Sequence, residues 1–225
     1  MNNKPVITID GPAGAGKSTI SRQLAERLCF IYLDTGALYR AVAFTLIRRG
    51  FSENERHMKG LCQDMKVTVK NREGQLHVFV DDEDVTGKLR TEEIGLLASR
   101  VSAMPVVREA LLSVQRDIAK DGGVVAEGRD MGTIVFPDAE IKFFLDASVE
   151  ERAERRHREL LRRGEFPSLH DVENDILLRD RQDRERSIAP LRPSPDAVII
   201  DSTDKTISQV VDIMMGIIDN IWHNH

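Results

Sequence analysis

Short apolar runs alternate with amphipathic stretches along nearly the whole chain. After the first run, apolar residues recur at helical spacing at Ile20, Leu24 and Leu28, and similar helical patterns follow or separate the other runs. Strands that alternate with helices form parallel sheets whose two faces are covered by helices. The pattern therefore predicts an α/β fold with a sheet of this kind. The predicted strands are residues 5–9, 30–34, 124–126, 141–145 and 197–201.

Residues 65–88 interrupt this order with a different pattern. Apolar and polar side chains alternate on both sides of a turn at residues 71–74, which predicts a β-hairpin, and residues 84–85 would add a third short strand. We therefore expect one domain over residues 1–225 with a small antiparallel insert. Its core is expected at about 1–60 and 100–225, and the insert at about 62–90.

The bulk composition narrows the class of protein. The chain of 225 residues is 41% hydrophobic, which suits one globular domain, and its net charge of −5 argues against a general binder of nucleic acid or anionic membranes. Cys29 and Cys62 lack the paired spacing of a disulfide scaffold or a metal cluster. Neither a bilayer-length apolar run nor a leader-like segment is present, so we expect a cytoplasmic monomer without membrane or nucleic-acid partners.

A glycine-rich segment directly after the first predicted strand carries the clearest chemical signal. It has the form G-x-x-x-x-G-K-S, in which glycines let successive backbone N–H groups point at a polyphosphate and the following helix adds the positive end of its dipole. Lys17 is then placed to reach the β- and γ-phosphate oxygens, and the hydroxyl of Ser18 to hold Mg²⁺. The segment predicts a binding site for a nucleoside triphosphate. Its residues are Gly11, Pro12, Ala13, Gly14, Ala15, Gly16, Lys17, Ser18 and Thr19.

Polar residues also follow other predicted strands, and in a parallel sheet these positions share the carboxyl edge. Residues 34–40 follow the second strand and include Thr35 and Arg40. Residues 127–132 follow the third strand and hold Arg129 and Asp130 between glycines, which let a ligand approach the backbone closely. We therefore expect both segments to lie beside the nucleotide.

A helix rich in arginine is predicted after the fourth strand. Arg155 and Arg158 are two of its six arginines, and the helix ends at a flexible break around Gly164. This arrangement is typical of a mobile lid, at about residues 152–170, that closes on the phosphates of ATP. A solvated helix face is the alternative, because acidic residues precede several of these arginines by four positions.

The arginines outside the glycine-rich segment indicate a second anionic substrate. In the helix after the lid, Arg179, Asp183 and Arg186 share one face, and Arg108 and Arg129 lie near the same sheet edge. An NTPase that transfers phosphate to water needs few such groups. Transfer between two phosphates needs charge stabilisation and orientation rather than a general base. The residues therefore predict a kinase whose acceptor is a small anion.

Two other interpretations remain open from these residues alone. A kinase for another small acceptor, such as UMP or a metabolite acid, would carry a similar anion site. A regulatory module that hydrolyses ATP slowly would use the lid for signalling and would release ADP without any acceptor. The dense second set of arginines favours a kinase over such a module.

Five segments together form a more specific pattern: residues 6–19 (VITIDGPAGAGKST), 33–40 (LDTGALYR), 127–139 (EGRDMGTIVFPDA), 143–148 (FFLDAS) and 189–191 (APL). These motifs resemble those of the bacterial cytidylate kinase family. The likeness covers nearly the full length of the chain, and residues 128–133 with the hairpin insert are its most specific parts. The resemblance implies a P-loop nucleoside monophosphate kinase that transfers the γ-phosphoryl group of ATP, with Mg²⁺, to CMP or dCMP.

The resemblance also implies roles for individual residues. Lys17, Arg129 and Arg186 are expected to stabilise the transferring phosphoryl group. Residues expected around the acceptor phosphate are Thr35, Arg40, Arg129 and Arg186; those expected to read cytosine are Ser99, Arg108 and Asp130; and those expected to hold the sugar are Arg179 and Asp183.

Overall fold

The main sheet is built from the apolar runs that the sequence predicts as strands. The computed structural model describes residues 4–50, 54–72 and 75–222, and within them five strands lie in the order β2-β6-β1-β7-β8. Every neighbouring pair is parallel, so the predicted α/β class is confirmed. The strands are β1 (Val6–Asp10), β2 (Ile31–Asp34), β6 (Val124–Gly128), β7 (Ile141–Asp146) and β8 (Val198–Asp201).

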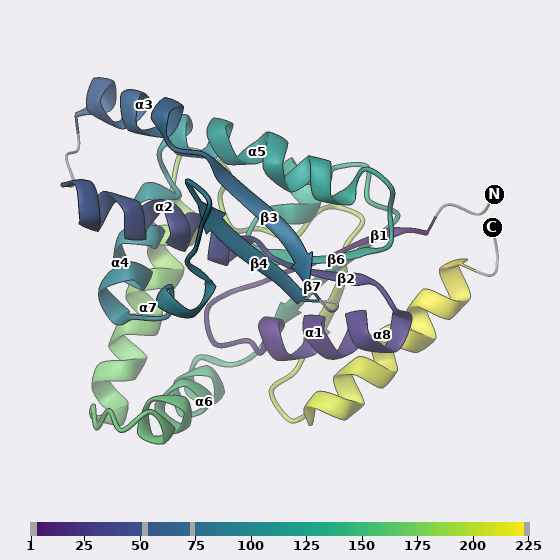
Figure 1. The fold of residues 1–225 in the computed structure, drawn as a ribbon. Helices are drawn as coiled ribbons and strands as arrows, with labels where there is room; N and C mark the ends of the chain where they lie inside the picture. Colours follow the sequence, from purple (N-terminus) through teal and green to yellow (C-terminus); the bar gives the residue numbers. More distant parts are fainter. Residues whose placement is uncertain (1–3, 51–53, 73–74, 223–225) are drawn as a thin grey trace.

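Helices cover both faces of this sheet (Figure 1). The helices α1 (Lys17–Leu28) and α8 (Ile207–Trp222) pack together on one face, where Val125 of β6 joins their apolar core. The other face carries α5 (Pro105–Ala119), whose apolar side chains pack with Val124 and Ala126. Because neighbouring residues of a strand face opposite sides, β6 is buried on both faces, which explains its uninterrupted apolar run.

Between β2 and β6 the chain forms a helical region with its own core and a small antiparallel sheet (Figure 1). Within the described residues this sheet has three strands, as the sequence predicts, although the third begins one residue earlier than expected. Residues 73–74 of the predicted turn lie outside the described residues. The elements are α2 (Thr35–Arg49), α3 (Glu55–Asp64), β3 (Val67–Arg72), β4 (Gln75–Val80), β5 (Glu83–Asp84), the turn η1 (Thr86–Lys88) and α4 (Glu92–Val101).

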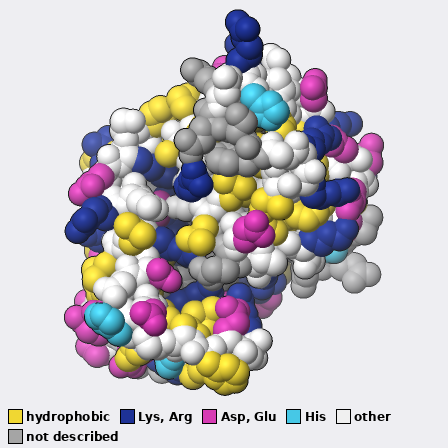
Figure 2. Space-filling model, turned by 90° about the vertical axis from the view of Figure 1, so that its left-hand side faces the viewer, with side chains coloured by type: hydrophobic (Ala, Val, Ile, Leu, Met, Phe, Trp, Pro, Cys, Tyr) yellow, Lys and Arg dark blue, Asp and Glu magenta, His cyan; other side chains and the backbone are white. Residues whose placement is uncertain are grey.

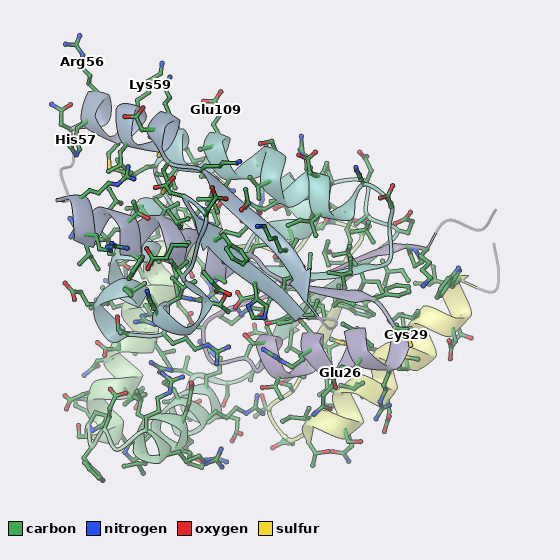
Figure 3. All side chains as sticks on the ribbon, in the orientation of Figure 1. Glu26, Cys29, Arg56, His57, Lys59 and Glu109 are labelled. Atoms are coloured by element: carbon green, nitrogen blue, oxygen red, sulfur yellow. The ribbon has the colours of Figure 1, made fainter. Side chains whose placement is uncertain are left out.

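The helix α3 is absent from the sequence-based prediction. Its sequence is mostly polar, and among its described side chains only Met58, Leu61 and Cys62 contribute to the core. Figure 3 shows the side chains of Arg56, His57 and Lys59 pointing outward from this helix. Three apolar residues on one short helix give too weak a periodic signal to stand out from a polar loop.

The helices α6 (Val149–Arg162) and α7 (Leu169–Glu185) pack against each other beyond the carboxyl edge of the sheet (Figure 1). Their contact is a small apolar cluster that contains Ala153, Leu160, Val172 and Ile176. Ser148 starts α6, because its Oγ accepts a hydrogen bond from the backbone N–H of Glu151 at 3.2 Å. This pair of helices forms one wall of the cleft described below.

The surface features agree with an ordinary globular domain. Cys29 is exposed at the end of α1 and Cys62 is buried, and neither forms a disulfide. In residues 4–50, 54–72 and 75–222, no helix combines the length and the apolar character needed to cross a bilayer.

Candidate active site

One cleft of about 1790 Å³ lies between the glycine-rich phosphate loop, the region of α2 and α4, and the helices α6 and α7. Figure 2 shows this side of the molecule, with Lys and Arg side chains inside the hollow. A pocket for one small ligand has a volume of roughly 300–1,000 Å³. The cleft is therefore large enough for two nucleotides.

The phosphate loop occupies the turn between β1 and α1, as its motif requires. Gly11 has φ +151°, and a Cβ atom at this position would lie 2.0 Å from the carbonyl oxygen of Leu145 on β7. No other residue fits so close to a neighbouring backbone. The loop therefore turns tightly at the sheet edge and directs α1 with its N-terminus toward the cleft.

Lys17 lies in the first turn of α1 and is buried within the loop. Its Nζ donates a hydrogen bond to the carbonyl oxygen of Pro12 at 2.6 Å. Burial lowers the pKa of Lys17 well below its ordinary value, and the positive charge of Arg129 lowers it further. A bound polyphosphate would favour the charged form of Lys17 again, so this side chain is suited to bind an anion.

Ser18 and Glu127 form the polar end of the phosphate-loop side of the cleft. This side, where the sequence predicts ATP, is the donor side. The Oγ of Ser18 donates a hydrogen bond to Oε2 of Glu127 at 3.1 Å, and the hydroxyl of Tyr32 donates to Oε1 of the same carboxylate. Burial raises the pKa of Glu127, and the nearby charge of Asp34 adds to this effect. A hydroxyl beside a carboxylate is the oxygen donor set that suits Mg²⁺, which usually takes one or two protein oxygens, phosphate oxygens and water.

The part of the chain that the structure describes places no all-protein metal site beside this pair. Among the described residues, no group of three or more His, Cys, Asp or Glu side chains is arranged to hold a metal ion. The residues at Ser18 therefore fit a cation that arrives with nucleotide phosphates rather than one held in a protein cage.

Asp10 joins the donor side to the next segment of the cleft. Its two carboxylate oxygens accept hydrogen bonds from the backbone N–H groups of Met131 and Gly132 at 2.9 and 2.8 Å. These residues begin a single turn of π-helix, η2 (Met131–Val135), directly after Arg129 and Asp130. Burial raises the pKa of Asp10 to about 6, although both hydrogen bonds oppose this shift. Asp10 therefore anchors the segment that presents the Arg-Asp pair.

Asp130 lies at the centre of a buried cluster of charges. One oxygen pairs with Nη2 of Arg108, and the other lies 3.6 Å from Nη2 of Arg186. Burial raises the pKa of Asp130, while the two arginines act in the opposite direction. The carbonyl oxygen and hydroxyl of Ser102 accept further bonds from Arg108 and Arg186 at 3.2 and 3.4 Å. Hydrogen-bond donors and hydrogen-bond acceptors are thus both present in this corner of the cleft.

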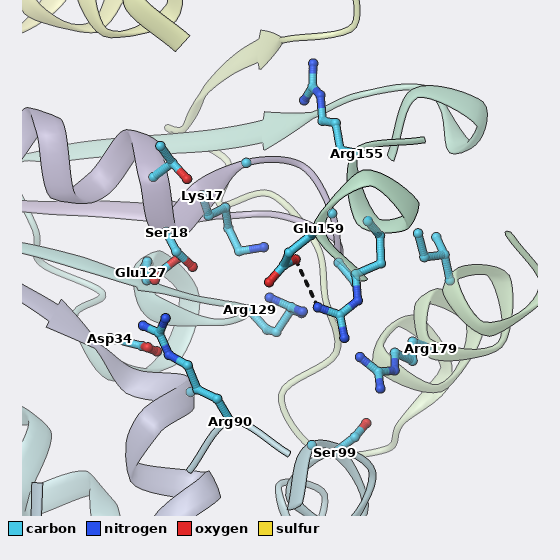
Figure 4. A pocket seen from close by; sticks show the side chains of 18 of the residues that line it. Lys17, Ser18, Asp34, Arg90, Ser99, Glu127, Arg129, Arg155, Glu159 and Arg179 are labelled. Atoms are coloured by element: carbon cyan, nitrogen blue, oxygen red, sulfur yellow. Dashed lines mark hydrogen bonds and ion pairs between the residues drawn. The ribbon is translucent and has the colours of Figure 1, made fainter. Parts of the chain in front are cut away.

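A second ion pair links the segment directly after β6 to α7. The Nε of Arg129 donates to Oδ2 of Asp183 at 2.7 Å. Figure 4 shows Lys17, Ser18 and Glu127 on one side of the pocket and Arg179 and Ser99 across it, with Arg129 in between. The helix face predicted for α7 therefore points toward the phosphate loop.

Thr35 and Arg40 lie where β2 passes into α2. The Oγ1 of Thr35 donates to the carbonyl oxygen of Glu127 at 2.7 Å. Arg40 forms an ion pair with Asp34 at 2.7 Å, and Asp34 also caps α2 by accepting a bond from the N–H of Ala37. These contacts hold a hydroxyl and a guanidinium group at the floor of the acceptor side.

The arginines of α6 differ in their surroundings. Arg155 donates to the hydroxyl and the carbonyl oxygen of Ser202 at 3.0 and 2.6 Å, and in Figure 4 its side chain extends away from Lys17. Arg158 is exposed and lies 3.7 Å from Glu151. The i,i+4 pairs that the solvated-face alternative expects are formed, so in this conformation the helix's own glutamates partly neutralise these arginines.

Nearly all residues singled out from the sequence come together here. The cleft is lined by every one of them except Gly11, Pro12 and Ala15, which form the backbone behind its wall. The structure thus places the donor and acceptor candidates in one cleft, and their individual roles remain predictions.

Other residues at the site lack a role in the sequence-based prediction. Asp10 and Glu127 lie within the recognised motifs, but their importance depends on β6 being the neighbour of β1, which the sequence does not reveal. Arg152 is indistinguishable in sequence from the exposed arginines of α6, yet it is buried against the phosphate loop. Ser102 carries no motif at all.

Solved structures share the fold at low sequence identity. A gluconokinase from Sinorhizobium meliloti matches with a TM-score of 0.50 and 14% identity, covering 100% of this chain and 97% of that one. An uncharacterized protein from Eubacterium ventriosum matches with a TM-score of 0.50 and 12% identity, covering 96% and 99%. At such identities the likeness concerns the fold alone.

Comparison of sequences finds relatives that are much more similar to this chain. The family model described as cytidylate kinase matches residues 7–220. A cytidylate kinase from Citrifermentans bemidjiense is 49% identical over 213 residues, which span 94% of this chain and 91% of the relative. A cytidylate kinase from Pelotomaculum thermopropionicum is 49% identical over 220 residues, 96% of each chain. The chain therefore belongs to the cytidylate kinase family.

Proposed function

We propose that this chain phosphorylates CMP and dCMP in the cleft described above, with ATP on the phosphate loop and the monophosphate on the charged cluster opposite. Family membership supports the reaction as a whole. The observation that carries the arrangement is that Lys17 and the buried cluster around Asp130 line one cleft. Two anionic substrates can thus meet end to end.

The triphosphate of ATP binds to the backbone N–H groups of the loop and to Lys17. Mg²⁺ bound with ATP supplies charge neutralisation at the phosphate oxygens, and Ser18 is the residue to hold it, with Glu127 beside it. Arg155 and Arg158 reach the phosphates only if they leave their present partners on α6 and at Ser202. Closure of α6 and α7 over the nucleotide would allow this.

The phosphate of CMP binds to guanidinium groups that are already oriented. Arg129, Arg186 and Arg40 each have a carboxylate within 4 Å, and these partners lie on different elements around the cleft. A phosphate presents several anionic oxygens and forms charge-assisted hydrogen bonds with arginine. The hydroxyl of Thr35 also lines this part of the cleft, and it can donate to the phosphate once it leaves the carbonyl oxygen of Glu127.

The base and the sugar of CMP fit the remaining groups. Cytosine carries an amino donor, which the carboxylate of Asp130 accepts, and ring acceptors, which Arg108 satisfies, with Ser99 at the edge. Uracil reverses part of this pattern and leaves buried polar groups unpaired. On α7, Arg179 and Asp183 line the same cleft, and they would hold the sugar hydroxyls.

The reaction needs no general base. A phosphate oxygen of CMP attacks the γ-phosphorus of ATP, the bond to the bridging β–γ oxygen breaks, and ADP leaves with that electron pair. The attacking phosphate is already an anion. Lys17, Arg129 and Arg186 offset the charge on the transferring group, which is the main barrier between two anions.

An acceptor-panel assay tests this function. ADP release is measured with CMP, dCMP, UMP, AMP or no acceptor, and Arg181→Ala, an exposed change on α7, serves as control. We expect release to depend on an acceptor and to be most efficient with CMP or dCMP. Release without acceptor would favour a regulatory ATPase, and a preference for UMP would reassign the base site.

Because one chain supplies both sides of the cleft, we also propose that the protein is a monomer, which light scattering can test.

A further inference from the structure

Arg152 is buried to an unusual degree for an arginine. Its exposed fraction is 1%, and it is the largest fully buried side chain in the described residues. Arginine is rarely buried to this extent unless its charge is paired and its N–H groups are bonded. The surroundings of this side chain therefore call for an explanation beyond the surface of a lid helix.

The guanidinium group of Arg152 connects three separate segments. Nη1 donates to the carbonyl oxygen of Ala13 in the phosphate loop at 3.0 Å and lies 2.7 Å from Oδ2 of Asp180 on α7. Nε donates to the carbonyl oxygen of Ala147, just before α6, at 3.0 Å. One cation thus joins the ATP-binding loop to the helix that carries the acceptor-binding residues.

The loop and α6 are also in direct backbone contact at this point. Gly14 has φ +78°, and a Cβ atom there would lie 3.0 Å from both the Cβ and the carbonyl oxygen of Arg152. The loop therefore cannot shift relative to α6 without disturbing Arg152. Any displacement of the loop on binding a phosphate would therefore reach this side chain.

On α7, Asp180 is held between positive charges. Oδ2 pairs with Arg152, Oδ1 is buried and has no hydrogen-bond partner among the described residues, and the charge of Asp180 also acts on Arg129. Asp183 lies three residues further along the same helix and binds Arg129. Polar contacts therefore run from Ala13 through Arg152 to Asp180, and α7 itself connects Asp180 to Asp183 and its ion pair with Arg129.

We infer that Arg152 and Asp180 form a positioning pair that sets α7, and with it the CMP site, relative to the ATP phosphates. The pair touches neither substrate in the proposed function, on which this inference rests. A buried ion pair is weak evidence for a purely stabilising role, because desolvation cancels much of its attraction. Because the pair lies between the two substrate sites, we expect each nucleotide to strengthen the binding of the other.

Calorimetry on Asp180→Asn tests the inference, because this change keeps the shape of the side chain and removes its charge. The affinity for CMP is measured alone and with a non-hydrolysable ATP analogue and Mg²⁺, and kcat and KM are measured beside it. In the unaltered protein we expect the analogue to tighten CMP binding at least about threefold. In Asp180→Asn we expect this ratio to fall to about one and kcat to fall about tenfold, with each single affinity changed less than twofold.

Two further variants separate positioning from stability. Arg152→Lys keeps the charge but cannot reach Ala13, Ala147 and Asp180 together, so it should lose the same mutual effect. Arg49→Met removes an arginine at the end of α2 that pairs with Asp81 at the surface, away from the cleft, and it should behave like the unaltered protein. The inference is overturned if Asp180→Asn keeps the wild-type ratio and kcat, or if the unaltered protein shows no mutual effect. Absence of CMP-dependent ADP release from the unaltered protein would instead contradict the proposed function.

Discussion

The two sides of the cleft are built to hold phosphate groups by different physical means. The donor side is a single continuous segment, residues 11–19, whose backbone N–H groups and one buried cation, Lys17, face the cleft. The acceptor side consists of guanidinium groups and carboxylates from α2, α5, the end of β6 and α7. One side is main chain, and the other is side chains gathered from distant parts of the sequence.

This difference shows where selectivity can arise. Backbone amides present the same hydrogen-bond donors to any triphosphate. The loop therefore holds the triphosphate in place and offsets its charge, but it does not distinguish one base from another. The acceptor side offers both donors and acceptors in a buried corner, where an unmatched ligand leaves polar groups unpaired. We therefore propose that the choice of substrate belongs to the acceptor side, and that the power to transfer phosphate belongs largely to the donor side.

Removing the one cation of the donor side should have the largest effect. Lys17→Ala takes away a charge that is positioned for the transferring phosphate, and we expect kcat to fall by about 10³-fold, as for other preorganised donors. Circular dichroism and thermal melting should show a folded protein. A folded variant that retains turnover within tenfold would remove Lys17 from the chemistry.

Asp10 lies between the two sides of the cleft, and its burial can be tested through the pH dependence of the protein's stability. Its folded-state pKa of about 6 lies above the unfolded value of 3.8, so folding favours the protonated form. Stability should therefore decrease as pH rises from about 4 to 6, by about 3 kcal/mol from this group. Urea unfolding of the wild type and of Asp10→Asn, compared at each pH, isolates the effect.

The difference in stability between the two proteins should change across this pH range and stay constant above about pH 7. A difference that is independent of pH would show that Asp10 is not buried as an acid with a raised pKa. A carboxyl NMR titration of Asp10 gives the same information without a substitution.

The acceptor side should fail selectively when its central carboxylate is removed. Asp130→Ala leaves Arg108 and Arg186 without their shared partner and removes the acceptor for the cytosine amine. We expect kcat/KM for CMP to fall about a hundredfold while the affinity for ATP changes little. Steady-state kinetics with each substrate varied in turn provide the measurement. CMP kinetics close to the wild type would refute the role in base reading.

The sugar contact should give the smallest and most specific effect. Asp183→Ala removes a carboxylate that we place beside the sugar, so the losses for CMP and dCMP should differ by up to about tenfold. Arg129 also loses its partner in this variant, which affects both substrates alike. Equal losses would therefore count against direct contact with the 2′-hydroxyl.

The two sides also differ in how far the sequence reveals them. The phosphate loop is local, so its glycines and Lys17 could be recognised from adjacent letters. The strands could be predicted because burial on both faces gives continuous apolar runs, as in β6. The pairs of Arg129 with Asp183 and of Arg152 with Asp180 join residues 54 and 28 positions apart, and no local pattern predicts which arginine is buried.

The central claim is that the two nucleotides meet along one edge of the sheet, with the monophosphate facing Lys17. A crystal structure with ADP, Mg²⁺ and CMP bound tests it most directly. We predict the phosphate of CMP between Arg129 and Arg186, pointing at Lys17, with the cytosine at Arg108 and Asp130. A monophosphate bound anywhere else than opposite Lys17 would contradict the account.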